Sequence, residues 1–220
     1  SSSIGIAMCP NAGEDPESIC KSADTAMYHA KEEGRNNFQF FSPELHAQTM
    51  KRINLESDLR RALDQNEFML FYQPQVDMNT KVVGMEALIR WQHGRLGIVN
   101  PGQFIPMAEK TGIFSPISEC VLHTACMQIR EWKKNHYLSP DATLAVNVSI
   151  RQLRQESFWG TLQKILSVTE LGPRYLELEV TESSVMDDPQ ETIVLLEKIH
   201  QLGVRISIDD FGTGFSSLKY

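Results

Sequence analysis

The chain has 220 residues, of which 41% are hydrophobic and 22% are charged, and its formal net charge is -7. This composition is typical of a soluble globular protein and excludes a disordered one. The negative charge argues against a broad basic face that binds a nucleic acid polymer. The sequence contains no apolar run near the roughly 18 residues of a membrane span, and it begins with no signal peptide.

The four cysteines, at positions 9, 20, 120 and 126, form no CxxC pair and no dense framework. This spacing favours a reducing cytoplasm, in which the thiols act as small apolar fillers. The chain begins at Ser1 without a methionine and stops at Tyr220 just after a loop. We therefore expect a piece of a longer protein, whose missing N-terminal part could be anchored in a membrane.

A strand, a helix and a second strand are predicted for the first 41 residues. Residues 2–8 and 38–41 have the apolar content of short strands, and Asp15-Pro16 supplies an N-cap and a first-turn proline for a helix between them. Gly34 lies where a C-terminal cap belongs. The apolar face of this helix consists of Ile19, Ala23, Ala26, Met27 and Ala30.

A second helix is predicted over residues 43–66. Its apolar side carries Leu45, Thr49, Ile53, Leu59 and Leu63. The pattern leaves two interpretations open, a signalling linker between two modules or a helix that packs across the bottom of the next domain.

From Phe68 onward, strands and helices alternate. Five strands are predicted, over residues 68–73, 81–91, 143–148, 175–181 and 204–210, with Pro74 ending the first of them. Helices are predicted over residues 104–110, 117–132 and 152–168 and between Pro189 and Gly203. This order indicates an α/β fold with a largely parallel sheet that is covered on both sides.

The last predicted strand ends in two adjacent carboxylates, Asp209 and Asp210, followed by a loop with Gly212 and Gly214. A strand places successive side chains on opposite sides unless the backbone turns, and the glycines permit a turn. Two carboxylates held close together repel each other, so a folded site usually needs a cation between them. For this pair alone, a solvated turn after the strand is the favoured interpretation, because acidic residues are common in turns.

Polar residues also stand near the ends of the other strands. They are Glu86 in the second strand, Asn147 in the third, and Glu179 and Glu182 in and after the fourth. In a (β/α) barrel the C-terminal ends of the strands converge on the face that carries the active site. Oxygen ligands suit hard cations such as Mg²⁺ or Mn²⁺. Each residue alone could be a cap or a surface residue, but the set predicts a metal site.

The segment from Ala23 to Asn36 resembles the C-terminal end of a GGDEF domain, the diguanylate cyclase family. The resemblance implies that Lys31 and Arg35 contact a nucleotide triphosphate, and one helical turn between them would point both the same way. A charged helix end stabilised by the helix dipole is the alternative for Lys31. The catalytic part of that family, with its signature loop, is absent, so no cyclase activity is expected.

Glu86-Ala87-Leu88 is the name motif of the EAL family of cyclic di-GMP phosphodiesterases, and six further segments resemble that family in order and approximate spacing. They are Tyr72–Pro74, Arg90-Trp91, Phe104–Glu109, Asn147–Ser149, Glu179–Glu182 and Asp209–Gly214. The resemblance implies part of a TIM-like (β/α)8 barrel. We expect a GGDEF remnant at 1–41, a linker helix at 42–65 and a truncated EAL domain at 66–220.

The resemblance also implies the roles of individual residues. One metal would be held by Glu86, Asn147, Glu179 and Asp209, and a second, Mg²⁺ or Mn²⁺ like the first, by Asp209 and Asp210. Glu86, Asp209 and Asp210 would be catalytic in the hydrolysis of cyclic di-GMP to pGpG. Arg90 would bind a substrate phosphate, and Gln73 and Leu88 would line the nucleotide pocket. Glu182 would order the loop 211–217, which communicates with a homodimer interface of the EAL domain.

The family's later motifs, which include a catalytic lysine, a second-metal glutamate and a late glutamine, would lie beyond Tyr220. Residues 66–220 are also shorter than the roughly 250 residues of an eight-stranded barrel. We therefore expect the chain alone to be poorly soluble or inactive and its full-length parent to be active. A non-catalytic cyclic di-GMP receptor and a dimerisation or interaction module remain alternatives.

Overall fold

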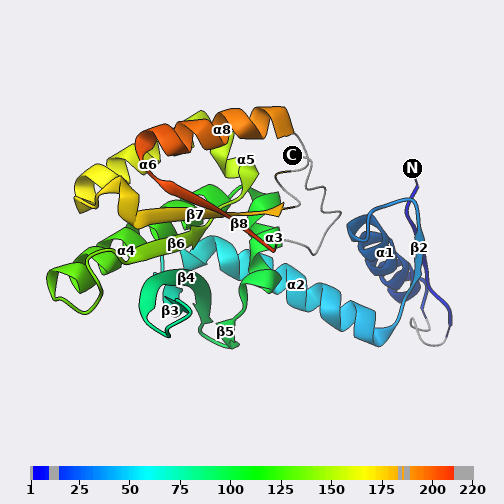
Figure 1. The fold of residues 1–220 in the computed structure, drawn as a ribbon. Coiled ribbons are helices and arrows are strands. Elements are labelled where there is room, and N and C mark those ends of the chain that lie inside the picture. The colour runs from blue at the N-terminus through cyan, green and yellow to red at the C-terminus, as the bar shows by residue number, and fades with distance from the viewer. Residues whose placement is uncertain (1, 10–14, 183–184, 186–188, 211–220) are drawn as a thin grey trace. The chain divides into compact units, whose positions relative to one another are not determined.

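The computed structural model of the protein describes residues 2–9, 15–182, 185 and 189–210 (Figure 1). The chain divides into two compact units, Ser1–Arg61 and Ala62–Tyr220. We refer to them as the first and the second unit.

The first unit contains β1 (Ile4–Ile6), α1 (Pro16–Glu32), β2 (Phe38–Phe40) and most of α2 (Pro43–Ala62). β1 and β2 pair in parallel. The Asp15 side chain accepts a hydrogen bond from the Ser18 backbone N–H at 2.9 Å, and Pro16 occupies the first turn. The predicted start of this helix is therefore confirmed, and its cap satisfies an N–H group that the helix itself leaves unpaired.

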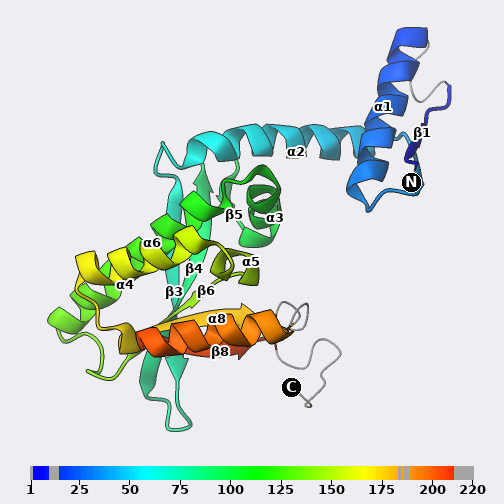
Figure 2. The ribbon, with the colours of Figure 1, turned by 90° about the horizontal axis from the view of Figure 1, so that it is seen from above.

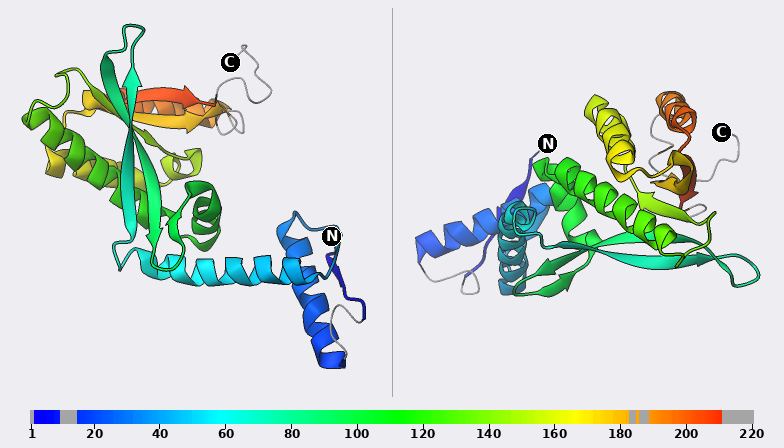
Figure 3. Two further views of the ribbon diagram at one scale, coloured as in Figure 1. Left: turned by 90° about the horizontal axis from the view of Figure 1, so that it is seen from below. Right: turned by 90° about the vertical axis from the view of Figure 1, so that its left-hand side faces the viewer.

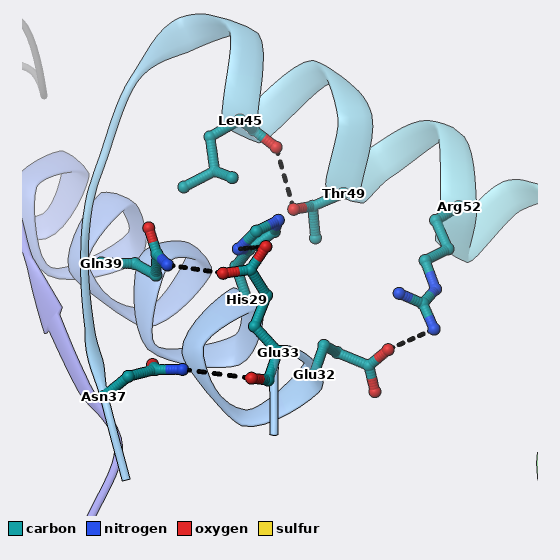
Figure 4. Close-up of polar contacts among 8 residues, drawn as sticks. All are labelled: His29, Glu32, Glu33, Asn37, Gln39, Leu45, Thr49 and Arg52. Atoms are coloured by element: carbon teal, nitrogen blue, oxygen red, sulfur yellow. Dashed lines mark hydrogen bonds and ion pairs between the residues drawn. The ribbon is translucent and has the colours of Figure 1, made fainter. Parts of the chain in front are cut away.

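Helix α2 ends four residues earlier than the 43–66 predicted from the sequence. Within the first unit it is tied to α1 by an ion pair between Arg52 and Glu32 (Figure 4). Thr49 is buried as predicted and donates to the Leu45 carbonyl at 2.9 Å, whereas Ile53, predicted on the same apolar side, is 45% exposed. The expected apolar stripe is therefore only partly buried.

The second unit is built on a mixed sheet. Its strands are β3 (Phe68–Val76), β4 (Val82–His93), β5 (Gly97–Val99), β6 (Thr143–Asn147), β7 (Leu176–Thr181) and β8 (Arg205–Asp209). The described strands follow the order β3-β4-β6-β7-β8, with β5 paired to β4. The steps from β4 to β8 are parallel, as predicted, whereas β3 and β5 run antiparallel to β4.

The antiparallel start of the sheet differs from the predicted alternation of strands and helices. β3 and β4 form a hairpin with no helix between them, and Asp77 Oδ1 accepts the Asn79 and Lys81 N–H groups in the turn at 2.8 and 3.0 Å. β3 also continues through Pro74, which pairs with Met85. Proline is tolerated there because, among the described strands, β3 has β4 as its one neighbour and lies at the sheet edge.

Helices connect the parallel strands. They are α3 (Pro101–Thr111), α4 (Phe114–Lys134), α5 (Ile150–Leu153), α6 (Glu156–Thr169) and α8 (Pro189–Leu202), with a 3₁₀ turn at Pro173–Tyr175. The single helix predicted over 152–168 is two helices, because the backbone at Gln155 is extended. Ser149 and Gln152 form a capping box at the start of α5, directly after β6.

The apolar core of the second unit lies on one face of the sheet. Leu144 and Val146 of β6 and Leu178 and Val180 of β7 belong to it. The residues that α4, α6 and α8 contribute to this core include Leu122, Ile129, Leu162 and Ile199. Helix α4 packs beside α6 (Figure 2), and the three helices cover the same side of the strands (Figure 3, right).

The prediction of helices on both faces is therefore wrong for the described part of the chain. Along each strand, residues that alternate with the core residues are largely polar, for example Asn147 beside Val146 and Glu179 beside Leu178. Such a face cannot pack against an apolar helix without leaving polar groups unpaired. It is the inner face of a TIM-like α/β fold, in which the helices form the outer layer.

Two further expectations concern cysteines and membrane spans. Cys126 is a buried filler, and burial raises the pKa of its thiol to about 12, but Cys20 and Cys120 are exposed, so the filler role does not extend to them. Among the described helices, none combines the length and the apolar content that a bilayer crossing requires.

We predict that Leu178→Ala destabilises the second unit by about 2–5 kcal/mol, because the side chain is fully buried in the core behind β7 and its loss leaves a cavity. Urea unfolding followed by circular dichroism measures the change. The control is Val168→Ala at a side chain that is 58% exposed, which should change stability by about 0.5 kcal/mol at most. Equal effects of the two substitutions would contradict the assigned core.

Candidate functional site

The predicted metal ligands of four strands lie on one face of the sheet, the face opposite the core. In the parallel register Glu86 is aligned with Ala145, Ala145 with Glu177, and Glu179 with Ser207. Aligned residues of neighbouring strands face the same side, and so do residues two positions apart. The shared face therefore carries Glu86, Asn147, Glu179 and Asp209. We call it the acidic face.

Two hydrogen bonds connect side chains of the acidic face across strands. The Asn147 amide donates to Glu86 Oε1 at 2.8 Å, from β6 to its neighbour β4. The Gln75 amide donates to Glu179 Oε1 at 3.4 Å, from β3 to β7. Gln75 was not among the predicted site residues. Its alternation with Gln73 placed both on one side of β3, but nothing local to the sequence indicates a bond to a residue 104 positions away.

Glu179 is the most electrostatically perturbed carboxyl of this face. Burial raises its pKa from its ordinary 4.5 to about 7, and repulsion from Glu86, Asp209 and Glu177 adds to the shift. The hydrogen bond from Gln75 acts in the opposite direction. The residue is only 9% exposed, so a bound cation would be the strongest available compensation for its charge.

The Asp209-Asp210 pair forms a turn, as the sequence suggested. Asp209 is the last residue of β8, and Asp210 has a φ of +56°, in the left-handed region that aspartate tolerates better than most residues. The Asp210 backbone N–H donates to Asp209 Oδ1 at 2.9 Å. Both residues are exposed. The glycines at 212 and 214 lie outside the described residues.

The predicted substrate residues border the acidic face. Gln73 is aligned with Glu86, and Leu88 and Arg90 follow Glu86 at alternate positions of β4, so all three face the same side. The Arg90 guanidinium lies 5.4 Å from the centre of the Phe71 ring and donates to its neighbouring Ile89 carbonyl at 2.8 Å. This stacking holds a planar cation on the same side of β4 as Glu86.

Leu88 and Asn147 also line an apolar cavity of about 290 Å³ between the sheet and helices α3 and α4. Ile105 of α3 and Ile117 of α4 form part of its wall, and Thr181 lines it from β7. The cavity therefore lies between the end of the acidic face and these two helices. Its walls suit a flat apolar or aromatic group better than a charged one.

Glu182 follows β7 directly and is only 4% exposed. The loop 211–217, which it was predicted to order, lies outside the described residues. The structure therefore shows Glu182 buried directly after the end of β7.

The donor chemistry of the acidic face fits a hard divalent cation. It offers carboxylate and amide oxygens from adjacent strands, and burial together with the like charges around Glu179 raises the pKa of that carboxyl. Among the described residues, no three acidic, histidine or cysteine side chains are close enough together to form a finished ion site. The carboxylates would have to rotate toward an incoming ion, and Asn147, whose amide nitrogen donates to Glu86, would have to turn its oxygen toward the ion.

Lys31 and Arg35 in the first unit do not share a helical face, so the prediction that they lie one helical turn apart and point the same way was wrong. Helix α1 ends at Glu32, and Gly34 and Arg35 have φ angles of +98° and +61°. The Arg35 N–H donates to the Ala30 carbonyl at 3.2 Å, which closes the helix in a Schellman arrangement. Both cationic side chains are exposed.

Glu33, next to this turn, accepts a hydrogen bond from Gln39 Nε2 at 2.8 Å, and its carbonyl accepts one from Asn37 Nδ2 at 3.3 Å (Figure 4). These bonds attach β2 to the end of α1. They fix the backbone around residues 33–39 without using either Lys31 or Arg35.

Comparison with known proteins gives two family matches. The EAL domain model matches residues 56–220, and the model of the diguanylate cyclase GGDEF domain matches residues 1–37. The bifunctional diguanylate cyclase/cyclic di-GMP phosphodiesterase MucR of Pseudomonas aeruginosa is 44% identical over 100% of this chain and 32% of its own length. The cyclic di-GMP phosphodiesterase PdeR of Escherichia coli is 36% identical over 100% of this chain and 33% of its own length.

Among solved structures, the chain is similar to the PaMucR phosphodiesterase in complex with c-di-GMP. The TM-score is 0.71 and the identity 44%, over 74% of this chain and 66% of that one. The chain thus spans about a third of the length of these two curated relatives. It belongs to the EAL domain family, and its first 37 residues are the C-terminal end of a GGDEF domain.

Proposed function

We propose that the complete gene product is a phosphodiesterase that hydrolyses cyclic di-GMP to linear pGpG with the help of divalent cations, Mg²⁺ or Mn²⁺. The observation that carries this proposal is the acidic face itself, on which four oxygen-bearing ligands come from four neighbouring strands. The relatives MucR and PdeR are named as cyclic di-GMP phosphodiesterases, which supports the choice of substrate.

In this proposal Glu86, Asn147, Glu179 and Asp209 hold one cation, and Asp209 and Asp210 contribute to a second. Bound cations would polarise the phosphodiester and lower the pKa of the attacking water. Asp209 suits the shared position because it ends β8 next to Asp210, where the backbone turns. The hydrogen bond from Asn147 already holds Glu86 toward β6.

The substrate would lie along β3 and β4. The Arg90 guanidinium is preorganised by stacking on Phe71 and can bind a phosphate through two N–H groups. Gln73, aligned with Glu86, can donate to the same dinucleotide. Leu88 borders the apolar cavity of about 290 Å³, which can take up a base.

Homodimerisation through the EAL domain and a cytoplasmic location belong to this proposal as well. The exposed thiols of Cys20 and Cys120 are consistent with a reducing compartment. The loss of activity expected for residues 1–220 alone stays a prediction, as does the role of Glu182 in ordering the loop 211–217.

We predict that Asp209→Asn lowers the hydrolysis of cyclic di-GMP by the complete gene product about 100-fold or more, because the change removes a charge from the proposed shared ligand. Chromatographic separation of pGpG in the presence of Mg²⁺ or Mn²⁺ measures the rate. The matched control is Asp141→Asn, just before the opposite end of β6, which should leave the rate unchanged.

This hydrolysis assay, combined with a measurement of cyclic di-GMP binding, separates the competing functions. Binding of cyclic di-GMP without hydrolysis by the unmodified protein would replace the phosphodiesterase with a receptor. Absence of both binding and hydrolysis would leave an interaction module. Normal turnover of Asp209→Asn would contradict the ligand assignment alone.

A further prediction concerns the pH dependence of stability without metal. The folded Glu179 carboxyl has a pKa near 7, against 4.5 in the ordinary state, so the folded protein binds more protons than the unfolded chain between these values. Its contribution to stability is therefore lost as the pH rises from about 4.5 to 7. In EDTA, Glu179→Gln should abolish this part of the decline.

Urea unfolding at pH 5, 6, 7 and 8 tests the prediction, with Glu197→Gln on the exposed side of α8 as the matched control. The Glu179→Gln variant should gain stability relative to the unmodified protein as the pH rises, and Mn²⁺ should reverse the order at pH 8. Parallel profiles of stability against pH for all three proteins would mean that burial and the neighbouring carboxylates do not raise the pKa of Glu179.

A further inference from the structure

The hydrogen bond from Gln75 to Glu179 crosses the acidic face without joining neighbouring strands. Gln75 lies on β3, the donor atom is Nε2, and the acceptor is Oε1 of Glu179 on β7, 3.4 Å away. β4 and β6 lie between these two strands in the sheet. The curvature of the sheet thus brings Gln75 of the β3–β4 hairpin to Glu179, a predicted metal ligand on the parallel strand β7.

The path of the Gln75 side chain depends on Gly84. Gln75 and Gly84 are aligned in the β3–β4 pair, so their side chains would occupy the same face. A methyl group at residue 84 would lie 2.7 Å from Gln75 Oε1 and 3.0 Å from Thr143 Oγ1. Contacts below 3.0 Å force a movement, and the flexible amide of Gln75 is the group that can move. The missing side chain of Gly84 therefore makes room for the amide.

The chemistry of Gln75 suits its position. Glu179 is surrounded by the carboxylates of Glu86, Asp209 and Glu177, whose repulsion acts on its charged form. A neutral amide can donate to the Glu179 carboxylate without adding a charge that would compete with a divalent cation. A donor held in this way orients a carboxylate ligand and keeps it available as an anion.

We propose that Gln75 is a positioning residue, held in place by the space above Gly84, that orients the carboxylate of Glu179 for a divalent cation. This inference rests on the proposed metal-dependent function and names a residue of the same site to which no role has been assigned. Gln75 acts through Glu179 and touches neither substrate nor the reacting atoms.

The test uses the complete gene product and Mn²⁺ as the probe, with free Mn²⁺ measured by electron paramagnetic resonance. Gln75→Met keeps the length of the side chain and removes the amide. We expect about tenfold weaker Mn²⁺ binding, within the range that loss of a residue behind a metal ligand typically causes. At saturating Mn²⁺ we expect a lower kcat and an unchanged KM for cyclic di-GMP, because the substrate contacts remain. Gln92→Met, an exposed position of β4, is the matched control and should change neither value.

Gly84→Ala provides an independent route to the same effect. If it acts by displacing the Gln75 amide, it should weaken Mn²⁺ binding in the native background and have little further effect in a Gln75→Ala background. This double-mutant comparison separates the positioning role from general damage to the fold. It also keeps the inference testable if Gln75→Met folds poorly.

The outcomes distinguish this inference from the proposed function. Hydrolysis by the unmodified protein combined with native Mn²⁺ affinity in Gln75→Met would overturn the role of Gln75 alone. Equal losses from Gly84→Ala in both backgrounds would overturn the link between Gly84 and Gln75. An unmodified protein that neither binds Mn²⁺ nor hydrolyses cyclic di-GMP would overturn the proposed function, and the role of Gln75 with it.

Discussion

The repulsion among carboxylates on one face of the sheet is the constraint on which the second unit depends. Glu86, Glu179 and Asp209 are brought together because parallel strands in register present alternate residues to the same side. Burial and the neighbouring negative charges both destabilise the ionised state of Glu179, and its pKa of about 7 expresses this cost. The free energy that offsets it must come from elsewhere in the fold.

The opposite face of the same strands supplies that free energy. Leu176, Leu178 and Val180 alternate with the acidic positions of β7, and all three are fully buried against the helices. A slip of one residue in the register would move Glu179 into the apolar core and Leu178 onto the acidic face. Because burial of apolar surface opposes such a slip, the core also fixes the position of the carboxylates.

The local patterns of the sequence predicted much of this arrangement. The alternation in β7 and the polar residues of β4, β6 and β8 are properties of single strands, so the shared face could be anticipated before the register was known. The β3–β4 hairpin was missed because Pro74 is a strand breaker in the sheet interior, whereas β3 is an edge strand among the described ones. Whether a strand is at an edge is a property of the whole sheet.

Two other misses have the same origin in geometry beyond a single element. Lys31 and Arg35 appear one helical turn apart in the sequence, but the left-handed residues from Gly34 to Asn36 end the helix between them. The reach of Gln75 to Glu179 depends on the curvature of the sheet and on the space above Gly84, which no local pattern encodes. Sequence periodicity thus identifies which face a residue occupies, but not which distant residue it meets there.

A functional face of this kind explains why the two sides of one sheet differ so strongly in character. Apolar contacts on the core side stabilise the fold. On the acidic side the protein keeps charged residues that cost stability and that apolar residues could replace. The amide groups of Gln75 and Asn147 moderate this conflict, because each donates to a carboxylate without neutralising it. Part of the hydrogen-bonding capacity of both carboxylates is thus satisfied within the protein, without a positive charge that would compete with a cation.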